Sequence, residues 1–227
     1  MFAVAISALH TDIEQEAAAL SVDLGLTPYE ARLTLAAGTP AIVLVTPDRP
    51  RALDCVARLH ARGQGAVACD VGAIMPSEQM TSLRRFHLEI DGLTLGDRPD
   101  TLPYTDIMAL VRATHPAPSG ERTQVLYLFR RVGGPPWILR ETGADYTSLG
   151  SRRAATRTEN FRVTVNLLRS LAPSAVYDER LLAVRSVPEV RSSAGGPGFS
   201  ASTESGTDLL AHVVALTIAR DERQAAR

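Results

Sequence analysis

Three arginines around the start of a predicted helix have the residue type and spacing that best suit a binding site. Arg152 and Arg153 precede the helix and Arg157 lies in its first turn, which a Thr156-x-x-Glu159 capping box opens. The free N–H groups and the dipole at such a helix end favour anions. These residues predict a site for phosphate or an acidic peptide, with a solvated run of arginines as the alternative.

A second group of polar side chains alternates along the predicted strand 86–91. His87, Glu89 and Asp91 fall at every second position, so they point to one face of that strand. Imidazole and carboxylate groups are suitable ligands for a divalent metal, although an ordinary solvated face opposite the apolar residues gives the same pattern. We expect the solvated face, and therefore no metal site.

Other reactive residue types give no catalytic set. Cys55 and Cys69 lie in apolar surroundings and predict reduced core residues rather than a disulfide or a nucleophile. Trp137 follows two prolines, which indicates a half-buried hairpin residue, with a ligand wall as the alternative. All 24 basic residues other than histidine are arginine, which excludes a Schiff-base or phosphate-loop lysine. We therefore predict no catalytic residues and no cofactor, and a non-enzymatic protein is favoured.

Composition and charge narrow the class further. The chain has 227 residues, 45% of them apolar, and a net charge of −1, so no basic field favours nucleic acid. No stretch approaches the ~18–20 apolar residues of a transmembrane helix. The first ten residues lack the charged segment of a signal peptide, which predicts a cytoplasmic protein.

The first 71 residues predict the order strand, helix, helix, strand, helix, strand. A Thr11-x-x-Glu14 capping box opens the first helix, and Thr27-Pro28-x-Glu30 opens the second. Asp48 caps the third helix, and glycines follow the second and third. The apolar run Ala41–Val45 is typical of a strand buried on both faces. The other predicted strands are 2–9 and 66–71.

The segments DLGLTPYEARLTL and DRPRALDCVARLHARGQGAVACD, in this order, resemble the C-terminal domain of ribosomal protein L7/L12 and the related ClpS adaptor fold. The resemblance covers about a third of the chain and implies the fold. Residues 8–12 replace the Asn-Asp-Asp turn of the adaptor, and the lysines of the ribosomal domain are missing. No binding residue of either family is therefore carried over.

Part of the same region is also similar to the opening of a phosphoacceptor receiver domain. That family needs an acidic pair after its first strand, an acceptor aspartate and a lysine. Here Asp48 is the one acid at the first of these places and the chain has no lysine. The resemblance therefore leaves a degenerate regulatory domain as an alternative.

The remainder of the chain predicts a strand-rich α+β module. Strands 124–131 and 137–140 flank a Gly-Gly-Pro-Pro turn, and a helix with Phe161, Val165 and Leu168 on one face follows. Strands closed by one helix resemble a bacterial pleckstrin-homology-like domain, while simple α+β packing on the first module is the alternative. The predicted divisions are 1–73, a connector 74–83, the module 84–190, a Gly/Ser-rich linker 191–206 and a helix 207–227.

Taken together, these features favour an adaptor that works through an unknown protein partner. One alternative is binding of an anionic ligand or a membrane surface through the second module, with Arg152, Arg153 and Arg157 as the site. Another is an unrecognised enzyme or a degenerate receiver. The last helix is expected to dock on the body of the protein rather than on a partner, because an isolated helix of this kind is not stable in water.

Overall fold

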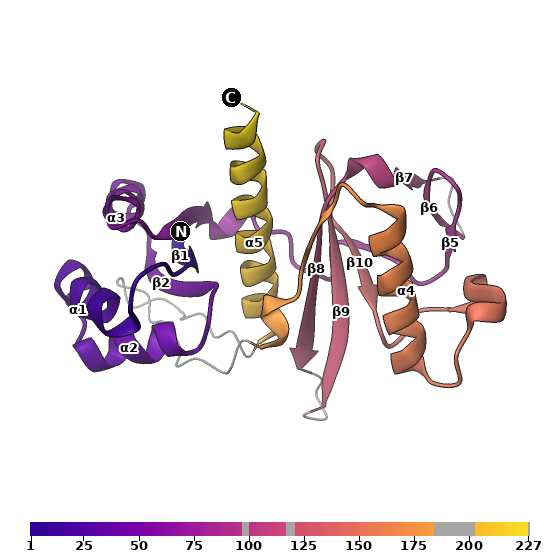
Figure 1. Ribbon diagram of the computed structural model, residues 1–227, viewed down its shortest axis with the longest axis horizontal. Coiled ribbons are helices and arrows are strands. Elements are labelled where there is room, and N and C mark those ends of the chain that lie inside the picture. Colours follow the sequence, from indigo (N-terminus) through magenta and orange to yellow (C-terminus); the bar gives the residue numbers. More distant parts are fainter. Residues whose placement is uncertain (97–99, 117–120, 184–202, 227) are drawn as a thin grey trace. The chain divides into compact units, whose positions relative to one another are not determined.

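The computed structural model describes residues 1–96, 100–116, 121–183 and 203–226 (Figure 1). Its α+β architecture confirms the predicted class: an N-terminal βααβαβ arrangement, a strand-rich middle and a long C-terminal helix. The chain forms two compact units. Unit 1 combines Met1–Ile74 with Arg180–Arg227, and unit 2 comprises Met75–Glu179. The last helix, which the sequence separated from the first module, therefore belongs to unit 1.

Unit 1 contains a three-stranded antiparallel sheet with its first strand in the centre. The strand order is β2-β1-β3, and both neighbours pair with β1 in antiparallel register. Three helices complete the N-terminal part. The elements are β1 Phe2–Ala8, α1 Ile13–Leu24, α2 Pro28–Ala36, β2 Ala41–Thr46, α3 Arg49–Ala61 and β3 Gly65–Asp70. All six residues of β2 are buried, as its apolar sequence predicts.

The helix starts follow local capping chemistry, with one correction. The predicted capping box of α2 is present: Thr27 accepts a hydrogen bond from the Glu30 backbone, and Glu30 accepts one from the Thr27 backbone. Asp48 caps α3 as predicted. At α1 the N-cap is Asp12 rather than Thr11, because the Asp12 carboxylate accepts from the Glu14 backbone N–H. The helix consequently starts one residue later than the motif predicted.

Alternating residues of the central strands face opposite sides of the unit 1 sheet. Val4, Ile6 and Ala66 belong to a core that also contains apolar residues of α1, α2 and α3. Since side chains alternate along a strand, Ala3 and Cys69, which are also buried, face the other side. The sheet therefore needs cover on both faces.

The long helix α5, Glu204–Ala225, supplies this second cover. It packs against β1 and β3, and Figure 1 shows it on the side of the sheet opposite α1, α2 and α3. Near its C-terminal end Arg220 Nη1 donates to the Ala66 carbonyl over 2.8 Å. The expected docking on the body is thus confirmed. The helix begins before the predicted boundary, and linker residues 191–202 lie outside the described part of the chain.

Unit 2 contains a five-stranded sheet and a smaller three-stranded sheet. In the larger sheet the order is β11-β8-β9-β10-β4, with antiparallel pairing of β8, β9 and β10 and parallel pairing at both edges. The predicted hairpin between β9 and β10 is confirmed. The strands are β4 Thr81–Ser82, β5 Phe86–Leu88, β6 Gly92–Leu95, β7 Thr101–Pro103, β8 Ile107–Pro116, β9 Arg122–Arg130, β10 Trp137–Arg140 and β11 Val176–Asp178.

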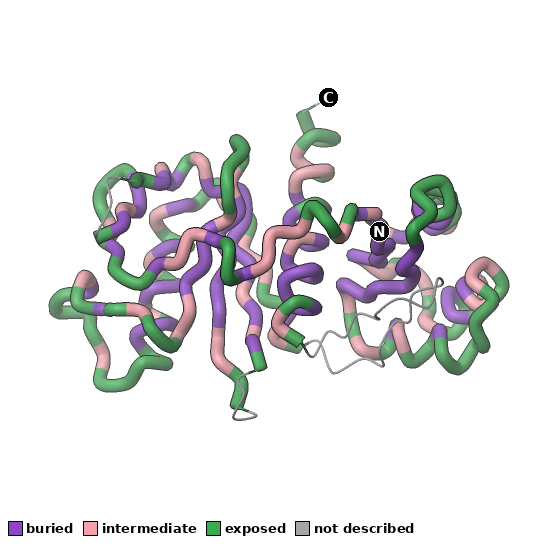
Figure 2. Tube along the Cα trace, turned by 180° about the vertical axis from the view of Figure 1, so that it is seen from behind, coloured by how far each residue is buried: buried purple, intermediate pink, exposed green. Residues whose placement is uncertain are grey.

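One helix completes the core of unit 2. The helix α4, Arg157–Leu171, packs Phe161, Val165 and Leu168 into the apolar cluster, as its periodicity predicted. Residues of both sheets share this cluster, among them Leu93 of β6 and Leu128 of β9. Figure 2 shows buried positions along the strands and exposed ones on the outer turns of the helices. Among the residues described, no helix is long and apolar enough to cross a membrane.

Candidate anion-binding site

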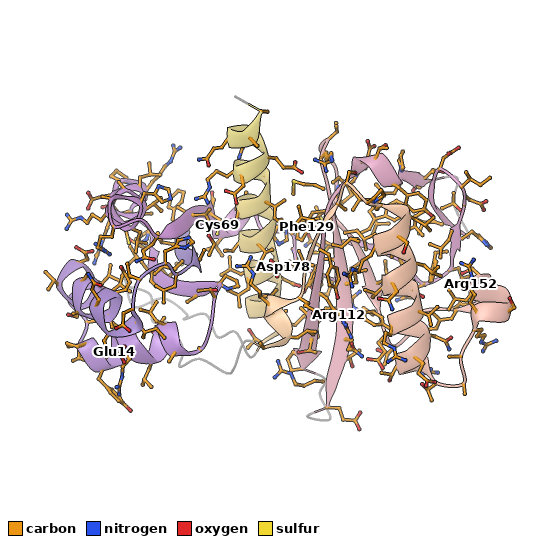
Figure 3. The ribbon with its side chains drawn as sticks, in the orientation of Figure 1. Glu14, Cys69, Arg112, Phe129, Arg152 and Asp178 are labelled. Atoms are coloured by element: carbon orange, nitrogen blue, oxygen red, sulfur yellow. The ribbon has the colours of Figure 1, made fainter. Side chains whose placement is uncertain are left out.

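The three predicted arginines lie where the sequence placed them. Arg152 is the last residue of a 3-10 helix, η3 (Thr147–Arg152), and Arg157 is the first residue of α4 (Figure 3). All three side chains are exposed. The capping box of α4 is also present, with Glu159 accepting from the Thr156 hydroxyl over 2.9 Å. A carboxylate therefore already lies at the helix end where an anion would bind.

A second carboxylate offsets the charge of this arginine group. Hydrogen bonds from Thr147 lower the pKa of Asp145, and the nearby positive charges of Arg85 and Arg153 lower it further. Asp145 is thus ionised at neutral pH and is near Arg153. The predicted site carries less net positive charge than its arginines alone indicate.

A better-formed candidate lies elsewhere in unit 2. A cavity of about 460 Å³ opens between the end of β10 and the segment that follows β4. Its volume is within the range of small-molecule sites. None of the three predicted arginines lines it. The lining residues are Glu78, Ser82, Leu83, Arg84, Arg140, Thr142, Gly143 and Ala144.

Strand pairing places the segments that carry the two arginines of this cavity next to each other. The parallel register joins Thr81 to Trp137 and Ser82 to Ile138, and the Leu83 backbone N–H donates to the Ile138 carbonyl over 2.9 Å. Beyond the Ser82–Ile138 pair the chain bends, since the Arg84 backbone N–H donates to the Ser82 carbonyl over 3.0 Å, and Arg85 then forms a parallel bridge with Asp145. The Arg84 carbonyl accepts a hydrogen bond from the Asp145 backbone N–H over 2.7 Å, and this bond fixes the backbone of Arg84 at the edge of the cavity.

A second hollow of about 380 Å³ adjoins the first. Ser82 and Arg84 line both spaces, so the end of β4 and the residues just after it border both hollows. Arg85 lines the second hollow, and its carbonyl accepts from the Gly96 backbone N–H over 2.9 Å. The other lining residues are Gln79, Met80, Thr81 and Leu95.

This arrangement suits an anion with hydroxyl groups. Guanidinium groups present several donors in a planar fork that matches phosphate and carboxylate oxygens. In the larger cavity Glu78 provides an acceptor, while Ser82 and Thr142 provide hydroxyls. Leu83, only 2% exposed, contributes an apolar surface. Charge recognition and a short apolar contact are thus available in one space.

Sequence patterns did not reveal this site, because it depends on the pairing of β4 with β10. The residues of β4 fell in the segment that the sequence assigned to a connector, and a two-residue strand has no periodicity to detect. The adjacent pair Arg84-Arg85 was the only local signal. The pairing of β4 with β10, which brings Arg84 and Arg140 to one cavity, joins residues more than 50 positions apart, and a local pattern does not encode it.

The predicted strand triplet is not assembled. The strand β5 ends at Leu88, and a turn follows in which the Glu89 backbone N–H donates to the Gly92 carbonyl over 2.9 Å. Ile90, one of the apolar residues on the opposite face of the predicted strand 86–91, is 91% exposed. The alternation therefore stops before Glu89 and Asp91. In the described ranges, no three histidine, cysteine or acidic residues are placed to hold a metal ion.

Trp137 and the two cysteines are core residues. Trp137 is 4% exposed and belongs to the unit 2 cluster, so it is more deeply buried than predicted. Cys55 of α3 and Cys69 of β3 are free and buried. Burial is the main cause that raises the pKa of each thiol to about 11. Both remain protonated at neutral pH, which makes them poor nucleophiles in the native state.

This chain was also compared with protein-family models, with characterised proteins and with solved structures. No family model, characterised protein or solved structure matches it. What this chain binds must therefore be inferred from the geometry and chemistry of its own residues.

Proposed function

We propose that this chain is a non-enzymatic binding protein whose second unit takes a small phosphate-bearing ligand between Arg84 and Arg140. The observation that carries this proposal is the cavity of about 460 Å³ whose lining includes two arginines, one at the end of β10 and one in the segment that follows β4. Charge-assisted hydrogen bonds to a phosphate are stronger than neutral ones, and a partly enclosed site is screened less by salt than an open surface.

The lining of the cavity supports binding rather than turnover. Ser82 and Thr142 are its only hydroxyl side chains, and neither histidine nor cysteine is among the described residues that line it. Glu78, the one carboxylate among the described lining residues, makes no hydrogen bond to either hydroxyl. A hydroxyl that no base activates is a weak nucleophile, so this set of side chains favours recognition of a ligand.

Titration calorimetry with inorganic phosphate tests this function on the full chain. The double variant Arg84→Gln/Arg140→Gln is expected to bind phosphate at least about 10-fold more weakly than the wild type, because two charge-assisted contacts are lost. The matched control is Arg152→Gln/Arg153→Gln, which removes two exposed arginines outside the cavity. This control is expected to bind phosphate as the wild type does.

The calorimetry contradicts the proposal if the wild type binds no phosphate, if the Arg84/Arg140 variant binds it unchanged, or if the control variant loses the binding. The last result moves the site to the junction of η3 and α4. Sedimentation with phosphatidic acid vesicles, compared with phosphatidylcholine vesicles, separates a membrane surface from the free ligand proposed here. Vesicle binding without phosphate binding also contradicts it.

A protein-interaction role for unit 1 is the second proposal, supported by exposed apolar residues at the turn between α1 and α2. Leu26, Tyr29 and Leu33 are 38%, 61% and 37% exposed. Tyr29 and Leu33 are one helical turn apart on α2, so they share a face, and the Arg32 guanidinium lies 5.7 Å from the Tyr29 ring centre. This surface suits an apolar segment of a partner that carries an acidic residue opposite Arg32.

The full chain with Tyr29→Asp/Leu33→Asp tests this second role. We expect this variant to lose a directly binding protein that the wild type captures. Its free energy of unfolding is expected to stay within about 0.5 kcal/mol of the wild-type value, the usual range for surface substitutions. Val132→Asp changes an exposed apolar residue of unit 2 and is the matched control. Equal capture by all three chains excludes this surface.

A further inference from the structure

The two neighbouring hollows of unit 2 have one arginine in common, so a single ligand can be considered for both. Arg84 lines both hollows, Arg140 lines the larger one and Arg85 lines the smaller one. Each hollow therefore has a pair of arginines, and the pairs have Arg84 in common. A guanidinium group carries five N–H donors, enough to contact two anionic groups at once.

The remaining lining residues define what should join the two anionic groups. Glu78, Ser82 and Thr142 in the larger hollow can exchange hydrogen bonds with hydroxyl groups. Gln79 and Thr81 in the smaller hollow offer amide and hydroxyl groups. Leu95 of the smaller hollow is 7% exposed and gives it an apolar surface like that of Leu83 in the larger one. A polyhydroxylated carbon chain matches both linings better than a purely apolar spacer.

We infer that the two hollows together bind one phosphorylated polyol with two phosphate groups, one between Arg84 and Arg140 and the other between Arg84 and Arg85. This inference rests on the proposed function, because it assumes that the larger hollow takes a phosphate. It extends that function by assigning the smaller hollow and by naming the class of ligand.

Of the two hollows, the smaller one, which Arg85 lines, is expected to contribute less to the affinity for the ligand. Asp145 is near Arg85 and is ionised at neutral pH, so it offsets part of the Arg85 charge. We therefore expect the second phosphate to add affinity and selectivity, while the first hollow is the one that binding requires.

Calorimetry with fructose 6-phosphate and fructose 1,6-bisphosphate, two probes that differ by one phosphate group, tests the inference on the full chain at about 0.15 M ionic strength. The wild type is expected to bind the bisphosphate at least about 10-fold more tightly, as one added charge-assisted arginine contact implies. Arg85→Gln is expected to remove this difference and to leave the affinity for the monophosphate unchanged. Arg84→Gln is expected to weaken the binding of both probes.

The outcomes separate this inference from the proposed function. Equal wild-type affinities for the two probes, or an equal loss of both on Arg85→Gln, contradict the two-phosphate inference while the larger hollow stands as a phosphate site. Binding of neither probe, together with no binding of inorganic phosphate, contradicts the proposed function itself. A preference for the bisphosphate that Arg152→Gln/Arg153→Gln removes and Arg85→Gln does not would overturn the assignment of the smaller hollow.

Discussion

A chain that ends at Ala183, and so lacks α5, is expected to lose the native state of unit 1. The helix α5 covers the sheet face formed by alternate residues of β1 and β3, including Ala3 and Cys69. Without this cover, a sheet buried on both faces exposes one apolar face to water, at a cost of roughly 25 cal/mol per Å² of apolar surface. Stabilities of single domains are only about 5–15 kcal/mol, so removal of one whole layer is decisive.

Thiol labelling measures this result directly, because both cysteines of the chain lie in unit 1. In the full chain Cys55 and Cys69 are buried and protonated, and we expect slow labelling at pH 8. In the shortened chain we expect both thiols to react as fast as in urea. The emission of Trp137, which lies in the unit 2 core, is expected to remain native-like.

A peptide of residues 203–226 provides the control for this truncation. Added to the shortened chain, it is expected to restore slow labelling of Cys69, because the covering helix is supplied again. Equal thiol protection in the shortened and full chains would show that α5 is not required for unit 1. The same logic applies to any fragment study, since a fragment that stops near the end of β3 lacks this layer.

The elements predicted best are those with strong local signals. The capping box at Thr27, the buried run of β2 and the apolar face of α4 each depend on residues within a few positions of one another, and the structure confirms them. The three-residue strand β5 was predicted too long, because a turn that begins at Glu89 overrides the alternation. Local patterns compete with tertiary contacts, and for short strands the tertiary contacts determine where the strand begins and ends.

The candidate site shows the same division. The arginine group around Thr156 carried a local helix-start signal, and its position was predicted correctly. The carboxylate of Asp145, which reduces its charge, comes from a separate turn. The cavity between Arg84 and Arg140 depends on the pairing of β4 with β10, which brings together segments distant in sequence. Sequence patterns report which residues are present, and register decides which of them meet.

Replacement of Arg62 by methionine is expected to lower the free energy of unfolding of unit 1 by about 3 kcal/mol, within the range for breaking one side of a buried ion pair. Glu16 of α1 is 1% exposed, and Arg62 donates to both of its carboxylate oxygens, with Nη2 2.7 Å from Oε1. Arg62 Nη1 also donates to Asp23 over 2.7 Å. In the variant, the buried Glu16 carboxylate keeps the 2.9 Å hydrogen bond donated by the side-chain amide of Gln64.

Two further variants show whether the loss comes from the unpaired buried charge. Arg58→Met removes an arginine that is 53% exposed and paired with Asp23 and Asp54, and we expect it to cost at most about 1 kcal/mol. Glu16→Met/Arg62→Met removes both buried charges and is expected to be more stable than Arg62→Met alone. The free energy of unfolding of unit 1 is measured by urea-dependent labelling of the two thiols in the wild type and the three variants. An Arg62→Met variant as stable as Arg58→Met, or a double variant no more stable than Arg62→Met, would mean that Glu16 does not depend on this pair, and that water or Gln64 alone satisfies its carboxylate.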